Sequence, residues 1–124
     1  MATKVMVVDD SRTSRRILKG VLMELGYEVC AEAKNGEEAY QMYGECQPDI
    51  VTMDITMPVM NGVEALLLLK KKYPDCKVIM VSAAGQKHIM LDAIKAGAKE
   101  FILKPFDVNS IKKAIEKTLE ETAE

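Results

Sequence analysis

The chain has 124 residues, the size of one domain, and its 48% hydrophobic content excludes a disordered segment. A formal net charge of −2 gives no basic surface for nucleic acid or for an anionic membrane. The isolated cysteines Cys30, Cys46 and Cys76 and the single histidine predict neither a disulfide framework nor a zinc site. No apolar run approaches membrane length, and the N-terminal segment is charged too early for a signal peptide, so we expect a cytoplasmic protein.

Five apolar runs, separated by longer amphipathic stretches, predict the strands. Four of them are almost continuously hydrophobic, which is typical of parallel strands that are covered on both faces. The second run alternates with polar residues, and because Val29, Ala31 and Ala33 then share one face, we expect an edge strand there. In chain order the runs are Lys4–Asp9, Tyr27–Ala33, Asp49–Asp54, Lys77–Ala83 and Glu100–Pro105.

The stretches that follow these runs carry helix signals. The first has an apolar stripe at helical spacing and ends at Gly26. Asn35 and Asn61 each stand three residues before a glutamate, as in a capping box, and begin the next two helices. Asp107 is the expected cap of the last helix, which is striped from Val108 to Leu119. Five successive strand–helix units predict one domain, a doubly wound parallel α/β sandwich with five helices. The first stripe comprises Ile17, Leu18, Val21, Leu22 and Leu25.

The third predicted helix contains four consecutive leucines followed by three lysines, Leu66–Lys72. At helical spacing, Val63, Leu66 and Leu67 face the sheet and leave Leu68 or Leu69 partly exposed. A single exposed leucine needs no functional explanation.

Polar side chains stand at the carboxyl ends of four of the five predicted strands. In open α/β sheets the functional crevice lies outside these strand ends, so residues from distant parts of the chain converge there. The first strand supplies Asp9 and Asp10, the third Asp54, the fourth Ser82 and the fifth Lys104. Each has a simpler explanation when taken alone: Asp10 or Ser11 as a helix cap, Asp54 and Lys104 as solvated loop residues. Their joint placement favours a site.

Three clustered carboxylates predict a bound cation. Two unit charges about 4 Å apart repel by roughly 4 kcal/mol at an effective dielectric constant of about 20. Lys104 offsets one charge, and Mg²⁺, which takes one or two carboxylates and keeps several waters, would offset the rest. A metal beside a lysine and a hydroxyl suits phosphoryl groups, and a carboxylate can itself be phosphorylated. Asp54 is the best candidate acceptor because it stands alone while Asp9 and Asp10 share the metal.

Four motifs carry a resemblance to a known family. They are "VVDDSR", "DIVTMDITMPVMNG", "VIMVSAAG" and "FILKPF". In this order and spacing, the chain resembles the receiver domain of two-component response regulators over all of residues 1–124. The resemblance implies a flavodoxin-like, CheY-like fold with five parallel strands in the order 2-1-3-4-5.

The resemblance also implies how a metal and a phosphoryl group are held. Asp54 would accept the phosphoryl group from a phosphohistidine of a kinase. Asp10 and Asp54 would ligate Mg²⁺ directly and Asp9 through water, with the backbone carbonyl of Thr56 as a further ligand.

A switch is implied at the other strand ends. Ser82 and Lys104 would bind the phosphoryl oxygens, and Phe101 would turn inward as Ser82 moves toward the phosphate. The charge of about −1.5 to −2 that a phosphoryl group adds would drive this movement. The peptide bond between Lys104 and Pro105 is expected to be cis.

Within the family, the chain is most similar to stand-alone chemotaxis proteins of the CheY type. The implied partners are a chemotaxis histidine kinase and a flagellar motor switch protein, which would bind the face made by the fourth helix, fifth strand and last helix. Thr56 and Ala84 lie where family members tune dephosphorylation, so the need for a dedicated phosphatase stays open. We expect a monomer that is not an enzyme beyond catalysing its own phosphorylation and autodephosphorylation.

Four alternatives compete with this interpretation. A phosphorelay intermediate shares every site residue and differs only in passing the phosphoryl group to a second histidine protein. A phosphatase of the haloacid-dehalogenase type needs a second acid two residues after the nucleophile, where Thr56 stands. An FMN carrier is disfavoured because Asp9 and Asp10 would repel its phosphate. A DNA-binding regulator is disfavoured by the negative net charge and by the lack of a second domain.

Overall fold

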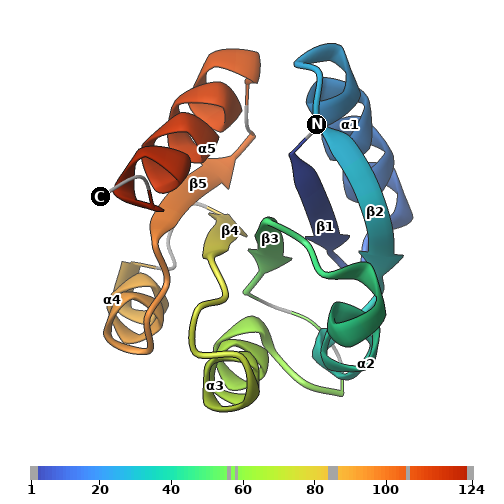
Figure 1. The fold of residues 1–124 in the computed structure, drawn as a ribbon. Helices are drawn as coiled ribbons and strands as arrows, with labels where there is room; N and C mark the ends of the chain where they lie inside the picture. The colour runs from blue at the N-terminus through green and yellow to red at the C-terminus, as the bar shows by residue number, and fades with distance from the viewer. Residues whose placement is uncertain (1–2, 56, 58, 84–86, 106, 123–124) are drawn as a thin grey trace.

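The computed structural model describes residues 3–55, 57, 59–83, 87–105 and 107–122, and in them every strand is followed by a helix (Figure 1). None of the helices in these ranges is both long and apolar enough to cross a membrane. The elements are β1 (Lys4–Val8), α1 (Arg12–Glu24), β2 (Glu28–Ala33), α2 (Gly36–Cys46), β3 (Ile50–Asp54), α3 (Gly62–Lys72), β4 (Val78–Ala83), α4 (Lys87–Lys95), β5 (Glu100–Lys104) and α5 (Val108–Thr122).

The strands form one parallel five-stranded sheet in the order β2-β1-β3-β4-β5, as the resemblance implied. Helices α1 and α5 cover one face, and α2, α3 and α4 cover the other (Figure 1). Strand β3 and the interior of β1 and β4 are fully buried, which explains their continuous apolar runs. The predicted edge position of β2 is confirmed.

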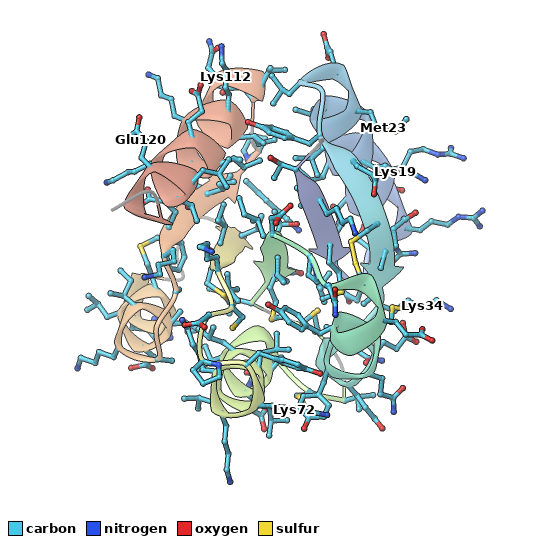
Figure 2. All side chains as sticks on the ribbon, in the orientation of Figure 1. Lys19, Met23, Lys34, Lys72, Lys112 and Glu120 are labelled. Atoms are coloured by element: carbon cyan, nitrogen blue, oxygen red, sulfur yellow. A yellow bond between two sulfur atoms is a disulfide. The ribbon has the colours of Figure 1, made fainter. Side chains whose placement is uncertain are left out.

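The core consists of two apolar layers, one on each side of the sheet. Val5, Val7 and Ile79 point toward α1 and α5, whereas Met6, Met53 and Met80 point toward α2, α3 and α4. These three methionines are completely buried. Charged side chains of the helices and loops, labelled in Figure 2 at Lys34, Lys72 and Lys112, extend into solvent instead.

The predicted helix starts are confirmed, with one difference. Asn61 and Glu64 form a complete capping box at α3, and Asn35 caps α2 by accepting a bond from the backbone N–H of Glu38. The Glu38 carboxylate does not complete a capping box with the backbone N–H of Asn35, because it accepts the backbone N–H of Lys34 instead. At α1 the cap is Ser11, so Asp10 is not the residue that caps this helix.

In each of two helices, one residue that was expected to face the sheet is exposed, whereas the rest of the predicted apolar face is confirmed. In α3, Leu66 is buried and Leu68 is 38% exposed, both as expected, whereas Leu67 is 54% exposed although it was expected to face the sheet. In α1, Ile17 is 53% exposed although it belonged to the predicted stripe. A step of one residue turns a helix by about 100°, so the face is fixed by which side the sheet approaches rather than by hydrophobicity alone.

Strand β2 contains a β-bulge that the alternating pattern did not predict. Val29 lies opposite Val5, but the next pair is Met6 with Ala31, so Cys30 is an extra residue on β2. Val29 therefore packs in the layer of α1 and α5, whereas Ala31 packs in the opposite layer. The expectation that Val29 shares a face with Ala31 and Ala33 is wrong, because the bulge inverts the alternation at this point.

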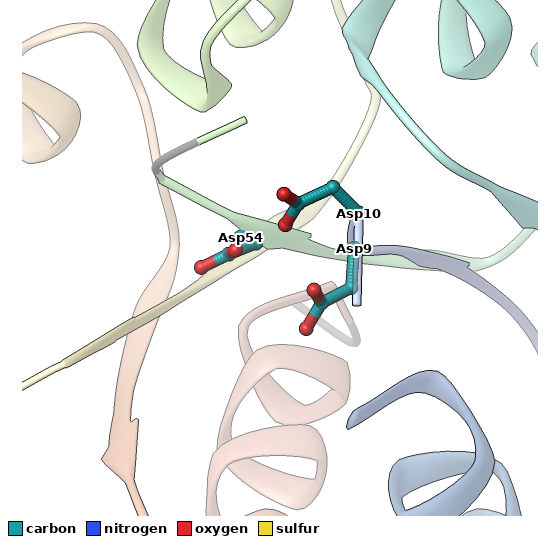
Figure 3. Close-up of side chains that lie close together, drawn as sticks. All are labelled: Asp9, Asp10 and Asp54. Carbon is teal, nitrogen blue, oxygen red and sulfur yellow. The ribbon is translucent and has the colours of Figure 1, made fainter. Parts of the chain in front are cut away.

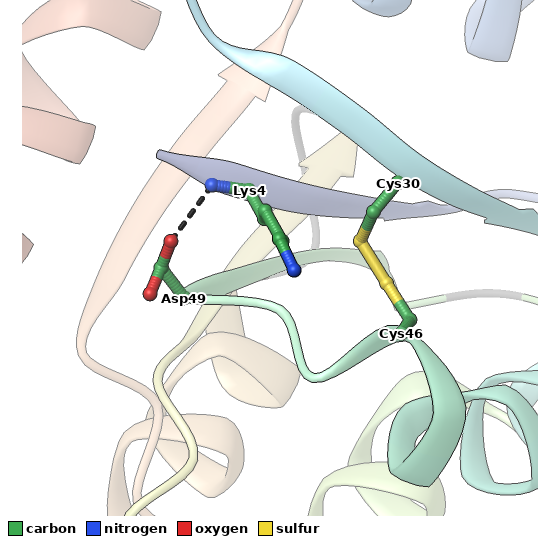
Figure 4. The surroundings of a disulfide bond; sticks show 4 residues. All are labelled: Lys4, Cys30, Cys46 and Asp49. Carbon is green, nitrogen blue, oxygen red and sulfur yellow. Dashed lines mark hydrogen bonds between the residues drawn. A yellow bond between two sulfur atoms is a disulfide. The ribbon is translucent and has the colours of Figure 1, made fainter. Parts of the chain in front are cut away.

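Cys30 of β2 and Cys46, the last residue of α2, are joined by a disulfide (Figure 4). Their Cα atoms are 6.0 Å apart, within the usual range for such a bond. The expectation of no disulfide was wrong, because spacing along the chain does not reveal which cysteines a bulge and a helix end bring together. Cys76 is a free, buried cysteine.

Candidate functional site

The acidic cluster is built where β1 and β3 end side by side. Val8 of β1 pairs with Met53 of β3, so the next residues, Asp9 and Asp54, emerge at the same edge of the sheet. The strand order reverses between these two strands, and open α/β sheets bind ligands at such a point. One carboxylate oxygen each of Asp9, Asp10 and Asp54 lie within 4.8 Å of one another (Figure 3). The predicted convergence of these three carboxylates is confirmed.

Burial differs among the three carboxylates. Asp9 is 4% exposed and Asp54 8% exposed, whereas Asp10 is open to solvent. The cluster thus has a buried floor and one solvent-facing ligand, so an ion or a phosphoryl donor can approach from outside.

Lys104, at the end of β5, reaches into this cluster. Its Nζ atom donates to Oδ2 of Asp9 at 3.1 Å and lies 3.7 Å from Oδ1 of Asp54. The other oxygen of Asp9 accepts the backbone N–H of Ser11 at 2.8 Å. Arg15 donates to the backbone carbonyl of Asp9 at 2.6 Å, a contact that sequence reasoning missed because nothing in the motif marks it. Asp9 is thus held at three atoms by protein donors.

The surroundings of Asp54 disfavour its charged form. Burial is the largest cause, and the charges of Asp9 and Asp10 add to it, so that the pKa of Asp54 is raised from 3.8 to about 6. Lys104 and the backbone N–H of Ile55 act in the opposite direction but only in part. A bound cation would reverse this effect by favouring the carboxylate.

The donor set fits Mg²⁺. All three side chains offer hard oxygen ligands, and a single lysine compensates only part of their charge. Few protein ligands and a solvent-facing side suit an ion that retains several of its waters. Thr56, the fourth expected ligand, and Ala84 lie outside the described residues.

Ser82 is buried near the end of β4, directly after Val81, which pairs with Asp54 of β3. Its hydroxyl is completely inaccessible and has no hydrogen-bond partner among the described residues. A buried hydroxyl without a partner costs stability, so an acceptor that arrives with a ligand would be favourable. Phe101 of β5 is half-buried and packs against the layer of α2, α3 and α4. The peptide bond between Lys104 and Pro105 is cis, as expected.

Gly62, the first residue of α3, fixes how that helix approaches the cluster. Its N–H donates to the carbonyl of Ile55 at 2.8 Å. A Cβ atom at this position would collide with the backbone carbonyl oxygen of Asp54. Sequence reasoning missed this role, although a glycine directly after a helix cap is the available signal.

Comparison with known proteins agrees with this geometry. A family model described as "Response regulator receiver domain" matches residues 5–116. The chain belongs to the response regulator receiver family. The receiver domain is 49% identical over 117 residues to "Chemotaxis protein CheY" of Thermotoga maritima, covering 94% of this chain and 98% of the relative. It is 48% identical over 119 residues to the protein of the same name from Bacillus subtilis, covering 96% and 99%.

A solved structure gives the same fold. The receiver domain superposes with a TM-score of 0.90 and 34% identity on a chain of the CheX-CheY-BeF3-Mg complex from Borrelia burgdorferi, covering 94% of this chain and 89% of that one. This likeness confirms the CheY-like arrangement of strands and helices.

Proposed function

We propose that this receiver domain acts in chemotaxis as a monomeric, cytoplasmic response regulator that accepts a phosphoryl group on Asp54 from a histidine kinase. The observation that carries the proposal is the convergence of Asp9, Asp10 and Asp54 within 4.8 Å, with Lys104 in contact with two of them. The relatives named chemotaxis protein CheY, which match nearly the full chain, support the chemotaxis role.

Mg²⁺ would be held by Asp10 and Asp54 directly, by Asp9 through water and by the backbone carbonyl of Thr56. The engagement of both Asp9 oxygens by Ser11 and Lys104 supports an indirect role for that carboxylate. When bound, the ion neutralises charge on the phosphoryl oxygens. Asp10 is exposed and therefore available to a partly hydrated ion.

In the transfer step, Asp54, Lys104 and Ser82 each have one role. An oxygen of the Asp54 carboxylate attacks phosphorus, the bond from phosphorus to the kinase histidine nitrogen breaks, and that nitrogen retains the electron pair. The product is an acyl phosphate on Asp54. Lys104, whose Nζ atom is already 3.7 Å from Asp54, contacts a phosphoryl oxygen, and the Ser82 hydroxyl donates to another.

Phosphorylation would then change the output face. Ser82 would gain a partner for its hydroxyl, and Phe101, which lies on the strand paired with β4, would turn inward. The face built from α4, β5 and α5 would bind a flagellar motor switch protein. The exposed apolar side chains on these elements support a docking role: Leu91 at 61%, Ile94 at 52%, Leu103 at 53% and Val108 at 37%.

The experiment is an intact-mass measurement after incubation with Mg²⁺ and a small acyl phosphate. Wild-type protein is expected to gain one phosphoryl group that is labile at alkaline pH, as an acyl phosphate is. Asp54→Asn, and wild-type protein with chelator, are expected to gain none. Asp75→Asn, a change at an exposed carboxylate, is the matched control and should be phosphorylated like wild type. An adduct that persists in Asp54→Asn would contradict the proposal.

A further inference from the structure

The cysteine pair lies at an edge of the molecule that the phosphoacceptor chemistry does not use. Cys30 is the extra residue of the bulge in edge strand β2, and Cys46 is the last residue of α2. A bulge changes the direction in which side chains of a strand point. Here it places Cys30 and Ala31, neighbours in sequence, both on the side of the sheet covered by α2. The Cys30 side chain thus lies on the same side of the sheet as Cys46, and the two sulfur atoms are bonded there.

We propose that Cys30 and Cys46 form a reversible redox pair that fastens the last turn of α2 to β2 when a small disulfide such as oxidised glutathione is available. One cysteine thiolate attacks oxidised glutathione and releases a first glutathione thiolate. The other cysteine thiolate attacks the mixed disulfide and releases a second one. The two thiol protons pass to the released thiolates, so two protein thiols and one oxidised glutathione give one protein disulfide and two molecules of glutathione.

Exposure separates this pair from the third cysteine. Cys30 and Cys46 are both partly exposed, so a small disulfide can reach them. Cys76 is 2% exposed, and burial is the main reason that the pKa of its thiol is raised. The described cysteines therefore comprise two that can exchange and one that is inert.

The reduced form is expected to keep the fold. Apart from their bond, Cys30 and Cys46 both pack against the apolar core that contains Ala33 and Ala39, so we expect them to remain there after reduction. A free cysteine behaves there as a small apolar residue. Reduction therefore loosens the attachment of α2 without exposing a new polar group, as a reversible pair requires.

The pair is also remote from the acidic cluster. Asp49 comes three residues after Cys46, and its Oδ2 atom accepts the backbone N–H of Lys4, the first residue of β1, at 2.8 Å (Figure 4). The bond thus lies near the amino ends of β1 and β3, whereas Asp9 and Asp54 lie at their carboxyl ends. Its opening should change the anchoring of α2 and leave the cluster in place.

The test is a titration of the folded protein with glutathione buffers of graded oxidation, followed by acid quenching, alkylation in denaturant and intact mass. Reduced protein is expected to carry three alkyl groups and oxidised protein one, with a transition between them that reductant reverses. Oxidation is expected to raise the thermal unfolding midpoint by roughly 10 °C. Hydrogen exchange should slow in β2 and the last turn of α2 and stay unchanged around Asp54.

Cys46→Ser is the control, and its unfolding midpoint should not depend on the glutathione ratio. Three alkyl groups at every glutathione ratio would show that the bond does not form. One alkyl group at every ratio would show that the bond is permanent. Either result overturns the proposal. The same midpoint shift in Cys46→Ser would also overturn it. If Cys46→Ser does not fold, the wild-type titration with reversal decides alone. None of these outcomes depends on the phosphoacceptor function proposed above.

Discussion

Replacement of Asp54 by asparagine is expected to stabilise the metal-free protein at neutral pH and to leave it unchanged in acid. Asp54 is buried beside two other carboxylates, and its pKa in the folded state is raised from 3.8 to about 6. Since one pKa unit corresponds to about 1.4 kcal/mol, ionised Asp54 destabilises the folded state by about 3 kcal/mol. Asparagine has a similar shape and no charge, so Asp54→Asn removes this cost.

The sign of the pH dependence follows from the direction of the pKa change. Between pH 3.8 and about 6 the folded protein binds more protons at Asp54 than the unfolded chain does. The contribution of Asp54 to stability is therefore fully present below about pH 4 and is lost as the pH rises through 6. The difference in the free energy of unfolding between Asp54→Asn and wild type should grow from about zero to about 3 kcal/mol over this window.

Urea denaturation with chelator, at a series of pH values from about 4 to 8, measures this difference. Asp75→Asn, at an exposed carboxylate, is the control and should change the free energy of unfolding by less than about 0.5 kcal/mol at every pH. Equal effects of Asp54→Asn at pH 4 and pH 7, or destabilisation at pH 7, would refute the argument that burial and neighbouring carboxylates disfavour the Asp54 charge.

Three further predictions concern the metal, the backbone and the partner. Mg²⁺ at about 100 times its Kd should raise the free energy of unfolding of wild type by about 2.7 kcal/mol at pH 7. In urea titrations, Asp10→Asn should need much more Mg²⁺ for the same effect. An equal Mg²⁺ dependence in the two proteins would show that Asp10 is not a ligand. Gly62→Ala should lower the free energy of unfolding by about 2–3 kcal/mol, because the new Cβ atom meets the carbonyl oxygen of Asp54. Gly20→Ala, with open space around it in α1, should raise the free energy of unfolding by about 0.5–1 kcal/mol. Urea curves that rank the two variants the other way would contradict this. Phosphorylated protein should bind an immobilised motor switch protein, and Leu103→Asp should weaken that binding at least about tenfold by placing a charge in an apolar contact; capture instead by a histidine phosphotransferase would favour the phosphorelay alternative.

Asp54 and Gly62 show which features of the site can be predicted from the sequence and which cannot. Asp54 could be placed at the edge of the sheet from its own strand, because a continuous apolar run must end at the carboxyl edge and parallel strands share that edge. Gly62 could not be assigned its role, because the collision that excludes a side chain there involves a backbone atom of another element. The first property is local to one segment, and the second exists only between two segments.

The amino-acid sequence by itself determined the order of the elements, the caps at Asn35 and Asn61, and the arrival of Asp9, Asp54 and Lys104 at one edge of the sheet. These follow from periodicity, capping and the end of each apolar run, which act within a few residues. The tertiary structure alone decided the bulge at Cys30, its disulfide with Cys46, and the exposure of Leu67 rather than Leu69. Each of these depends on the register between β1 and β2 or on the side from which the sheet meets a helix, and such pairings are fixed only when distant segments pack together.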